Sequence, residues 1–148
     1  MNDKKYRAAA KRHLEICEYM LDYLDKIFYA DSYSKENILV DIYCLSGYII
    51  ECIVSYAIGE LELSQSQFTE TRKIHNFQHN DIPLLCKHLP KIDNSIKNLI
   101  RNSGVKDLYQ NWNPKVRYEE MNPFRENDIR QFVILSKSIY QIINEAVK

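Results

Sequence analysis

Histidine and cysteine side chains are the first candidates for chemistry in this sequence. His75 and His79 are four residues apart, which on a helix would point both rings to one side, and Cys86 and His88 follow soon after. Imidazole and thiolate groups are the ligands that zinc prefers. However, Asn-Phe-Gln fills the space between the two histidines, without the glutamate of a helical zinc-protease motif. We therefore expect no bound metal, and we interpret a histidine here as a hydrogen-bonding residue near a helix start.

Arginine and histidine together could cleave RNA without a metal. A guanidinium can stabilise the charge of a phosphorane while an imidazole transfers the proton. Six residues separate Arg72 from His79, and five separate Arg7 from His13. Because such spacings also arise by chance, they define a hypothesis only. If the chain is a nuclease, its candidate catalytic residues are Arg72 and His79, with Glu51 nearby and His75 as an alternative histidine.

A basic stretch with aromatic residues could bind nucleic acid. Between residues 87 and 117 there are seven basic side chains and two acidic ones, together with Tyr109 and Trp112. Phosphate contacts and base stacking could therefore occur together. The candidate ligand-binding residues are Trp112, Lys115, Arg117 and Tyr118. In the competing interpretation Trp112 and Tyr118 fix a long loop to the fold, and Arg117 pairs with Glu51.

Other catalytic classes find little support in the residues. The sequence has only 3 glycines, Gly47, Gly59 and Gly104, which excludes Gly-rich dinucleotide and phosphate-binding loops. Cys17, Cys44 and Cys52 lie within apolar stretches, so burial is expected instead of nucleophilic reactivity. We expect no cofactor.

The composition predicts one all-α domain. The chain has 148 residues, of which 45% are hydrophobic and 27% charged, with only 4 prolines, so it is suited to a packed fold with few tight turns. Its formal net charge of zero predicts no strong overall attraction to nucleic acid or membrane. The start, MNDKKYRAAAKRH, lacks the apolar core of a secretory signal, so we expect a cytoplasmic protein.

The first two predicted helices differ in character. From about Asp3 to Tyr29 the apolar residues recur every three or four positions, which indicates one buried face. From about Lys35 to Ile58 the pattern is nearly continuous, with sixteen apolar residues among the twenty-one from 38 to 58. Such a helix should be surrounded on most sides. Asp41 and Glu51 interrupt the apolar run, so we reject a membrane-spanning interpretation.

Shorter elements are expected to follow. After a polar loop or short turns over 59–80, one helix is predicted from Asp81 to about Leu89, with His88 facing inward, and another over 93–102. The segment 105–127 contains Pro114 and Pro123 and is predicted to be largely irregular, which in so compact a chain favours a functional loop. The last helix should begin near residue 127 or 128. The fold expected is a bundle of about five helices.

The few polar positions of the second helix share one face. Gly47, Glu51 and Ser55 are spaced four apart, so they line up along the helix. Gly47 would allow another helix to approach closely, and Glu51 would be a buried carboxyl that needs a hydrogen-bonding partner.

Three segments in order resemble the HEPN family of helical domains. Residues 43–57 are similar to its second helix, with a Gly-Tyr pair followed by Glu-Cys; residues 75–85 are similar to its His-containing helix start. The segment Trp112-Asn-Pro-Lys-Val-Arg-Tyr118 is similar to its Trp-x-Pro-x-x-Arg-Tyr loop. The resemblance implies a four- or five-helix bundle that forms a homodimer.

The resemblance also carries expectations about function. HEPN domains act as metal-independent ribonucleases or as partners of nucleotidyltransferases in toxin–antitoxin and phage-defence systems. The ribonucleases carry Arg, four to six residues and His late in the chain, but no histidine follows His88 here. We therefore expect a non-catalytic module that binds nucleotide, RNA or a protein partner such as a nucleotidyltransferase, with the ribonuclease as the alternative.

Overall fold

A computed structural model of the chain describes residues 3–27, 32–63, 81–118 and 124–148. Over these residues the protein is all helical and has no strand, which confirms the all-α prediction. The elements in order are α1 (Asp3–Lys26), α2 (Ser32–Glu60), α4 (Asp81–His88), α5 (Pro90–Asn102), α6 (Lys106–Asn111), the short 3₁₀-helix η2 (Pro114–Tyr118) and α7 (Glu126–Ala146).

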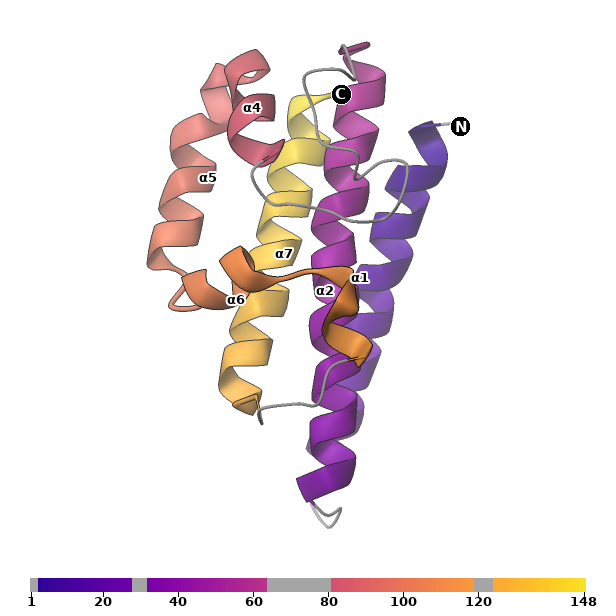
Figure 1. Cartoon of the computed structure of the whole chain (residues 1–148). Coiled ribbons are helices and arrows are strands. Elements are labelled where there is room, and N and C mark those ends of the chain that lie inside the picture. The colour runs from indigo at the N-terminus through magenta and orange to yellow at the C-terminus, as the bar shows by residue number, and fades with distance from the viewer. Residues whose placement is uncertain (1–2, 28–31, 64–80, 119–123) are drawn as a thin grey trace.

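Three long helices form the body of the bundle, with α2 between α1 and α7 (Figure 1). Helix α7 runs antiparallel to α1, because Lys137 pairs with Glu18 at 3.1 Å and Arg130 pairs with Asp25 at 2.7 Å. Helices α4 and α5 lie at the outer edge beyond α7, while α6 and η2 cross the front of the bundle (Figure 1).

Helix α2 is the centre of the core, as its composition predicts. All eight residues from Glu51 to Ile58 are buried, and Ile49, Ile50 and Ile53 have no exposed surface. Helices α1, α7, α4 and η2 all contact it, so there is no exposed stripe along most of its length. A helix that is apolar on every side requires such an enclosure.

The length and apolar character of α2 would also suit a membrane span. Its most apolar window is 72% buried inside the protein, however, as expected for the central helix of a bundle. Burial against other helices therefore accounts for this apolar sequence without a membrane.

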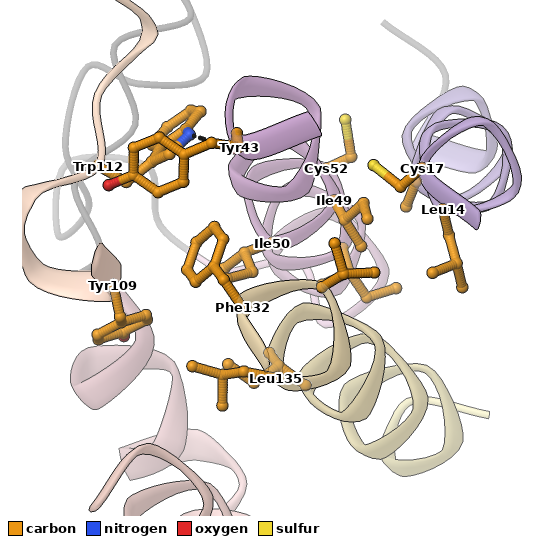
Figure 2. Packing of buried hydrophobic residues seen from close by; sticks show 14 of the residues in the cluster. Leu14, Cys17, Tyr43, Ile49, Ile50, Cys52, Tyr109, Trp112, Phe132 and Leu135 are labelled. Carbon is orange, nitrogen blue, oxygen red and sulfur yellow. Dashed lines mark hydrogen bonds between the residues drawn. The ribbon is translucent and has the colours of Figure 1, made fainter. Parts of the chain in front are cut away.

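Aromatic packing joins α2 to α7 at the middle of the core (Figure 2). Phe132 is fully buried, and its ring meets that of Tyr43 edge-on with centroids 5.1 Å apart. The Tyr43 hydroxyl donates a 2.6 Å hydrogen bond to the carbonyl oxygen of Leu108 in α6. Tyr43 therefore connects α2 and α7 to residues 106–118, which contain α6 and η2 and are called the crossing segment below.

Three sequence predictions about the later elements are wrong. The segment 105–127 is not largely irregular, since α6 and η2 account for much of its described part. Helix α5 begins at Pro90 and not near Asp93, because proline is well suited to the first helical turn. His88 is exposed and does not face inward, since α4 ends at that residue.

Candidate functional site

The crossing segment is attached to α2 through Trp112. The indole is only 3% exposed, and its Nε1–H donates a 3.1 Å hydrogen bond to the carbonyl oxygen of Tyr43 (Figure 2). The ring also meets Tyr48 edge-on, with centroids 5.3 Å apart. Hydrogen bonding and aromatic packing together fix the segment against the bundle.

Gly47 provides the space that the indole fills. A Cβ atom added at Gly47 would overlap the Cε2, Nε1 and Cδ2 atoms of Trp112. The close approach predicted at this glycine therefore exists, but the approaching group is a tryptophan side chain and not another helix. Gly47 and Trp112 form a pair in which neither residue can change alone without cost.

The structure corrects the role expected for Trp112. A base-stacking residue must offer a ring face to solvent, whereas this indole is enclosed and its N–H group is already bonded. Trp112 therefore anchors the segment, as the competing interpretation of the sequence proposed.

The 3₁₀-helix η2, which follows Trp112, exposes two other predicted ligand-binding residues to solvent. Tyr118 is 83% exposed and Lys115 is exposed, while Val116 between them is buried against the core. The backbone of Arg117 belongs to η2, but its side chain lies outside the described residues, as does any pairing with Glu51. Of the four predicted ligand-binding residues, Lys115 and Tyr118 are thus at the surface and Trp112 is beneath them.

Local hydrogen bonds explain why η2 forms. The Asn113 side-chain oxygen accepts a 2.9 Å bond from the Lys115 N–H, and the Asn113 carbonyl accepts one of 3.2 Å from the Val116 N–H. Pro114 occupies the first helical position, where its missing N–H has no consequence. This cap and the burial of Val116 hold the short helix in place.

Glu51 lies one turn beyond Gly47 and is only 3% exposed. Burial raises its pKa to about 8, because the surrounding protein disfavours the carboxylate form. Ser55, one turn further, is 2% exposed, so the predicted polar face of α2 is buried throughout. At neutral pH the Glu51 side chain is mostly a neutral acid that can donate a hydrogen bond.

The remaining nuclease candidates are not assembled by the described residues. Arg72, His75 and His79 lie outside the described part of the chain. In the second Arg–His pair, the Arg7 guanidinium lies 5.9 Å from the centre of the Tyr56 ring, whereas His13 lies beside Tyr48, two helical turns away on α2. The two side chains of that pair therefore belong to different places on the bundle.

His13 itself is half-buried. Its Nδ1 atom has no hydrogen-bonding partner among the described residues. Burial, and secondly the neighbouring Arg12 charge, lower its pKa below the ordinary value, so the ring is neutral at pH 7.

The cysteines are buried thiols, as predicted. Burial raises the pKa of Cys17 and Cys86 to about 11 and that of Cys52 to about 12. Thiolate formation at neutral pH is therefore strongly disfavoured, and none of these three has the electropositive, open setting of a nucleophile. Among the described residues, no group of three or more His, Cys, Asp or Glu side chains gathers at a metal-binding distance.

Sequence reasoning missed the part that Tyr43 plays. Its carbonyl accepts a hydrogen bond from the Trp112 indole and its hydroxyl donates one to Leu108 in α6, so a single α2 residue holds the crossing segment at two points. In the sequence Tyr43 is one apolar residue among many, and only contacts between distant segments distinguish it. Burial raises the pKa of its hydroxyl above the usual range, so it stays a hydrogen-bond donor.

Comparison of the chain with protein-family models, with curated proteins and with solved structures found no match.

Proposed function

We propose that this chain is a HEPN-type helical module that binds nucleotides or single-stranded RNA through η2, without cleaving them. The observation that carries the proposal is Tyr118, a large aromatic side chain that is 83% exposed on a segment anchored by the buried Trp112. Burying exposed aromatic surface is favourable, so an exposed ring on an anchored segment is a suitable platform for a base.

The spacing within η2 supports this proposal. Side chains three residues apart in a 3₁₀-helix lie on the same side, which places Lys115 beside Tyr118. A base could stack on the phenol ring while the ammonium group meets the adjacent phosphate. Arg117, from the same turn, would be the second phosphate contact. The all-α bundle is compatible with the family proposed. Of the resembling segments, residues 43–57 lie in α2, residues 81–85 lie in α4 and residues 114–118 form η2.

The resemblance also leads us to propose a homodimer, in which a second η2 surface would double the RNA contacts. Light scattering during size-exclusion chromatography should give twice the chain mass, and a monomer would remove this part of the proposal. A toxin–antitoxin or phage-defence setting, with a nucleotidyltransferase partner, belongs to the same family-based proposal.

Replacing the exposed tyrosine is expected to weaken RNA binding. Tyr118→Ala should raise the Kd for a short fluorescein-labelled single-stranded RNA about tenfold, because stacking contributes about 1–3 kcal/mol per base. Tyr118→Phe keeps the ring and should bind like the original chain. Fluorescence anisotropy at low salt measures both.

The matched control is Tyr19→Ala on α1, where the exposed fraction is 74%. It should leave the Kd unchanged. Lys115→Ala and Arg117→Ala should each weaken binding a few-fold and reduce its dependence on salt concentration, since each removes one phosphate contact. Equal behaviour of the Tyr118 and Tyr19 variants, or no RNA binding at low salt, would refute the proposal.

The alternative function, a metal-independent ribonuclease, is favoured by one observation. Burial raises the pKa of the Glu51 carboxyl to about 8, so it has the protonation state of a general acid at neutral pH, although at 3% exposure the bundle must open before RNA can reach it. This alternative predicts that RNA is cut in the presence of EDTA and that His79→Ala abolishes cutting while the helical circular dichroism is retained. If cleavage is absent, or is the same in the His79 variant, the nuclease assignment is wrong.

A further inference from the structure

A groove between α5 and α7 is separate from the surface described above. It has a volume of about 470 Å³, and the described residues that line it belong to these two helices, apart from Ser103 just after α5. Ile134 lies in it and is 55% exposed, which is unusual for so large an apolar side chain. Figure 1 shows α5 beside α7 at the edge of the bundle, away from α1.

The groove is lined by apolar and neutral polar side chains. Its apolar surface comes from Leu99, Ile134, Leu135 and Ile142, and its polar surface comes from serine, asparagine and glutamine side chains. None of the described residues that line it is charged, in a chain where 27% of residues are charged. The floor of the groove therefore offers no counter-charge to a phosphate group.

The groove is also long. A second hollow of about 530 Å³ continues it toward the end of α7, and the two share Ser95 and Ile142. Together they extend from Gln131 to Ala146, a distance of roughly 22 Å at 1.5 Å per helical residue. Small Ser95 and Ser138 side chains on facing helices would let another backbone approach closely. These dimensions match a helix of about four turns.

The two edges of the groove differ in charge. On α5, exposed Lys91 lies one turn before the lining residue Ser95, and exposed Arg101 lies one turn after the lining residue Asn98. The one acidic residue of α5, Asp93, is bonded to Lys97 at 2.9 Å, so the α5 edge has an excess of positive charge. On the α7 edge, Glu145 pairs with Lys148 at 3.0 Å. An occupant with acidic residues along the α5 edge would be electrostatically complementary.

We propose that the α5–α7 groove binds an amphipathic α-helix of a partner protein. The helix presents Leu or Ile at positions i, i+3 or i+4, and i+7 to the groove floor, and Asp or Glu toward Lys91 and Arg101. The apolar floor supplies affinity, and the basic edge sets the orientation. This binding site shares no residue with η2 and does not depend on the RNA proposal.

A displayed library of random amphipathic helical peptides of about four turns tests the proposal directly. The full chain is used to select binders, and a Ser138→Arg variant, which places a long cation in the groove, is used for counter-selection. Enriched peptides are expected to share the apolar spacing and an acidic flank. Their synthetic forms should bind Ser138→Arg at least tenfold more weakly in fluorescence anisotropy, and Lys11→Glu on α1 should be without effect.

Reversing a charge on the α5 edge tests the orientation of the bound helix in the groove. Arg101→Glu should weaken an acidic-flank peptide about threefold, as expected for an exposed ion pair, and should strengthen the same peptide with lysines in the flank. Ile134→Arg, which needs no space inside the protein, should weaken binding even if the Ser138 variant folds poorly.

Any of four results would overturn the proposal. No peptide is enriched, or the enriched peptides lack the apolar spacing, or they bind the Ser138 and Ile134 variants unchanged. The proposal also fails if Ile134→Arg converts a dimer of this chain into a monomer, because the groove would then hold a second copy.

Discussion

Gly47→Ala is expected to lower the free energy of unfolding by about 3 kcal/mol, although the change adds only a methyl group. The added Cβ would occupy the position of the Trp112 indole, so the ring must leave its place between Gly47 and Tyr48. Displacing a buried tryptophan costs about 3–5 kcal/mol, and alanine's higher helix propensity returns about 1 kcal/mol. On an exposed helix face the same substitution would stabilise.

A double-mutant cycle separates this explanation from a general effect on α2. Trp112→Ala alone should also cost about 3 kcal/mol, since it removes a large buried side chain. Once the indole is absent, Gly47→Ala should become neutral or stabilise by up to about 1 kcal/mol. Urea unfolding followed by circular dichroism gives each value. If the two losses simply add, the indole does not occupy the space above Gly47.

Glu51→Gln is expected to remove a large pH dependence of stability. The folded chain holds the Glu51 proton up to about pH 8, whereas the unfolded chain releases it near the ordinary value of 4.5. Between these values the folded state binds more protons, so the stability due to this group is fully present below the lower pKa and is lost as pH rises through the folded pKa. The loss approaches about 1.4 kcal/mol per pH unit.

The measurement is the difference in unfolding free energy between the original chain and Glu51→Gln from pH 5 to 9. The difference should fall steadily to about pH 8 and then level off, because glutamine stays neutral. His13, whose pKa is lowered, acts with the opposite sign below pH 6.5 but is present in both proteins. The control Glu15→Gln, at an exposed position of α1, is measured over the same pH range. A pH-independent difference for Glu51→Gln would contradict the burial of an acid at this position.

The long helices could be predicted from sequence because their patterns extend over many turns. A single apolar face defined α1 and α7, and apolar residues on all sides defined α2 as the buried helix. Glu51 was predicted as a buried carboxyl because it lies in the middle of a stretch that is apolar on nearly every side of the helix. These inferences require only the geometry of the helix itself.

The crossing segment could not be predicted in the same way. Helices α6 and η2 are too short to show a helical period of apolar residues. They are held by contacts with a distant part of the chain, namely the Tyr43 hydroxyl and the α2 face on which Trp112 packs. The sequence suggested both an exposed and a buried role for Trp112, and its fit over Gly47 favours burial. The α5–α7 groove was missed because it depends on how the two helices pack against each other, and the residue pattern of either helix alone does not reveal that packing.

The most direct test of the central claim is a ¹H–¹⁵N NMR titration of the labelled chain with a short single-stranded RNA. The account predicts that the largest chemical-shift changes fall on residues 113–118, that the Trp112 indole N–H moves little because it stays bonded to Tyr43, and that α5 and α7 are unaffected. Changes centred on the α5–α7 groove, or no changes at low salt, would contradict the proposal that η2 is the binding surface.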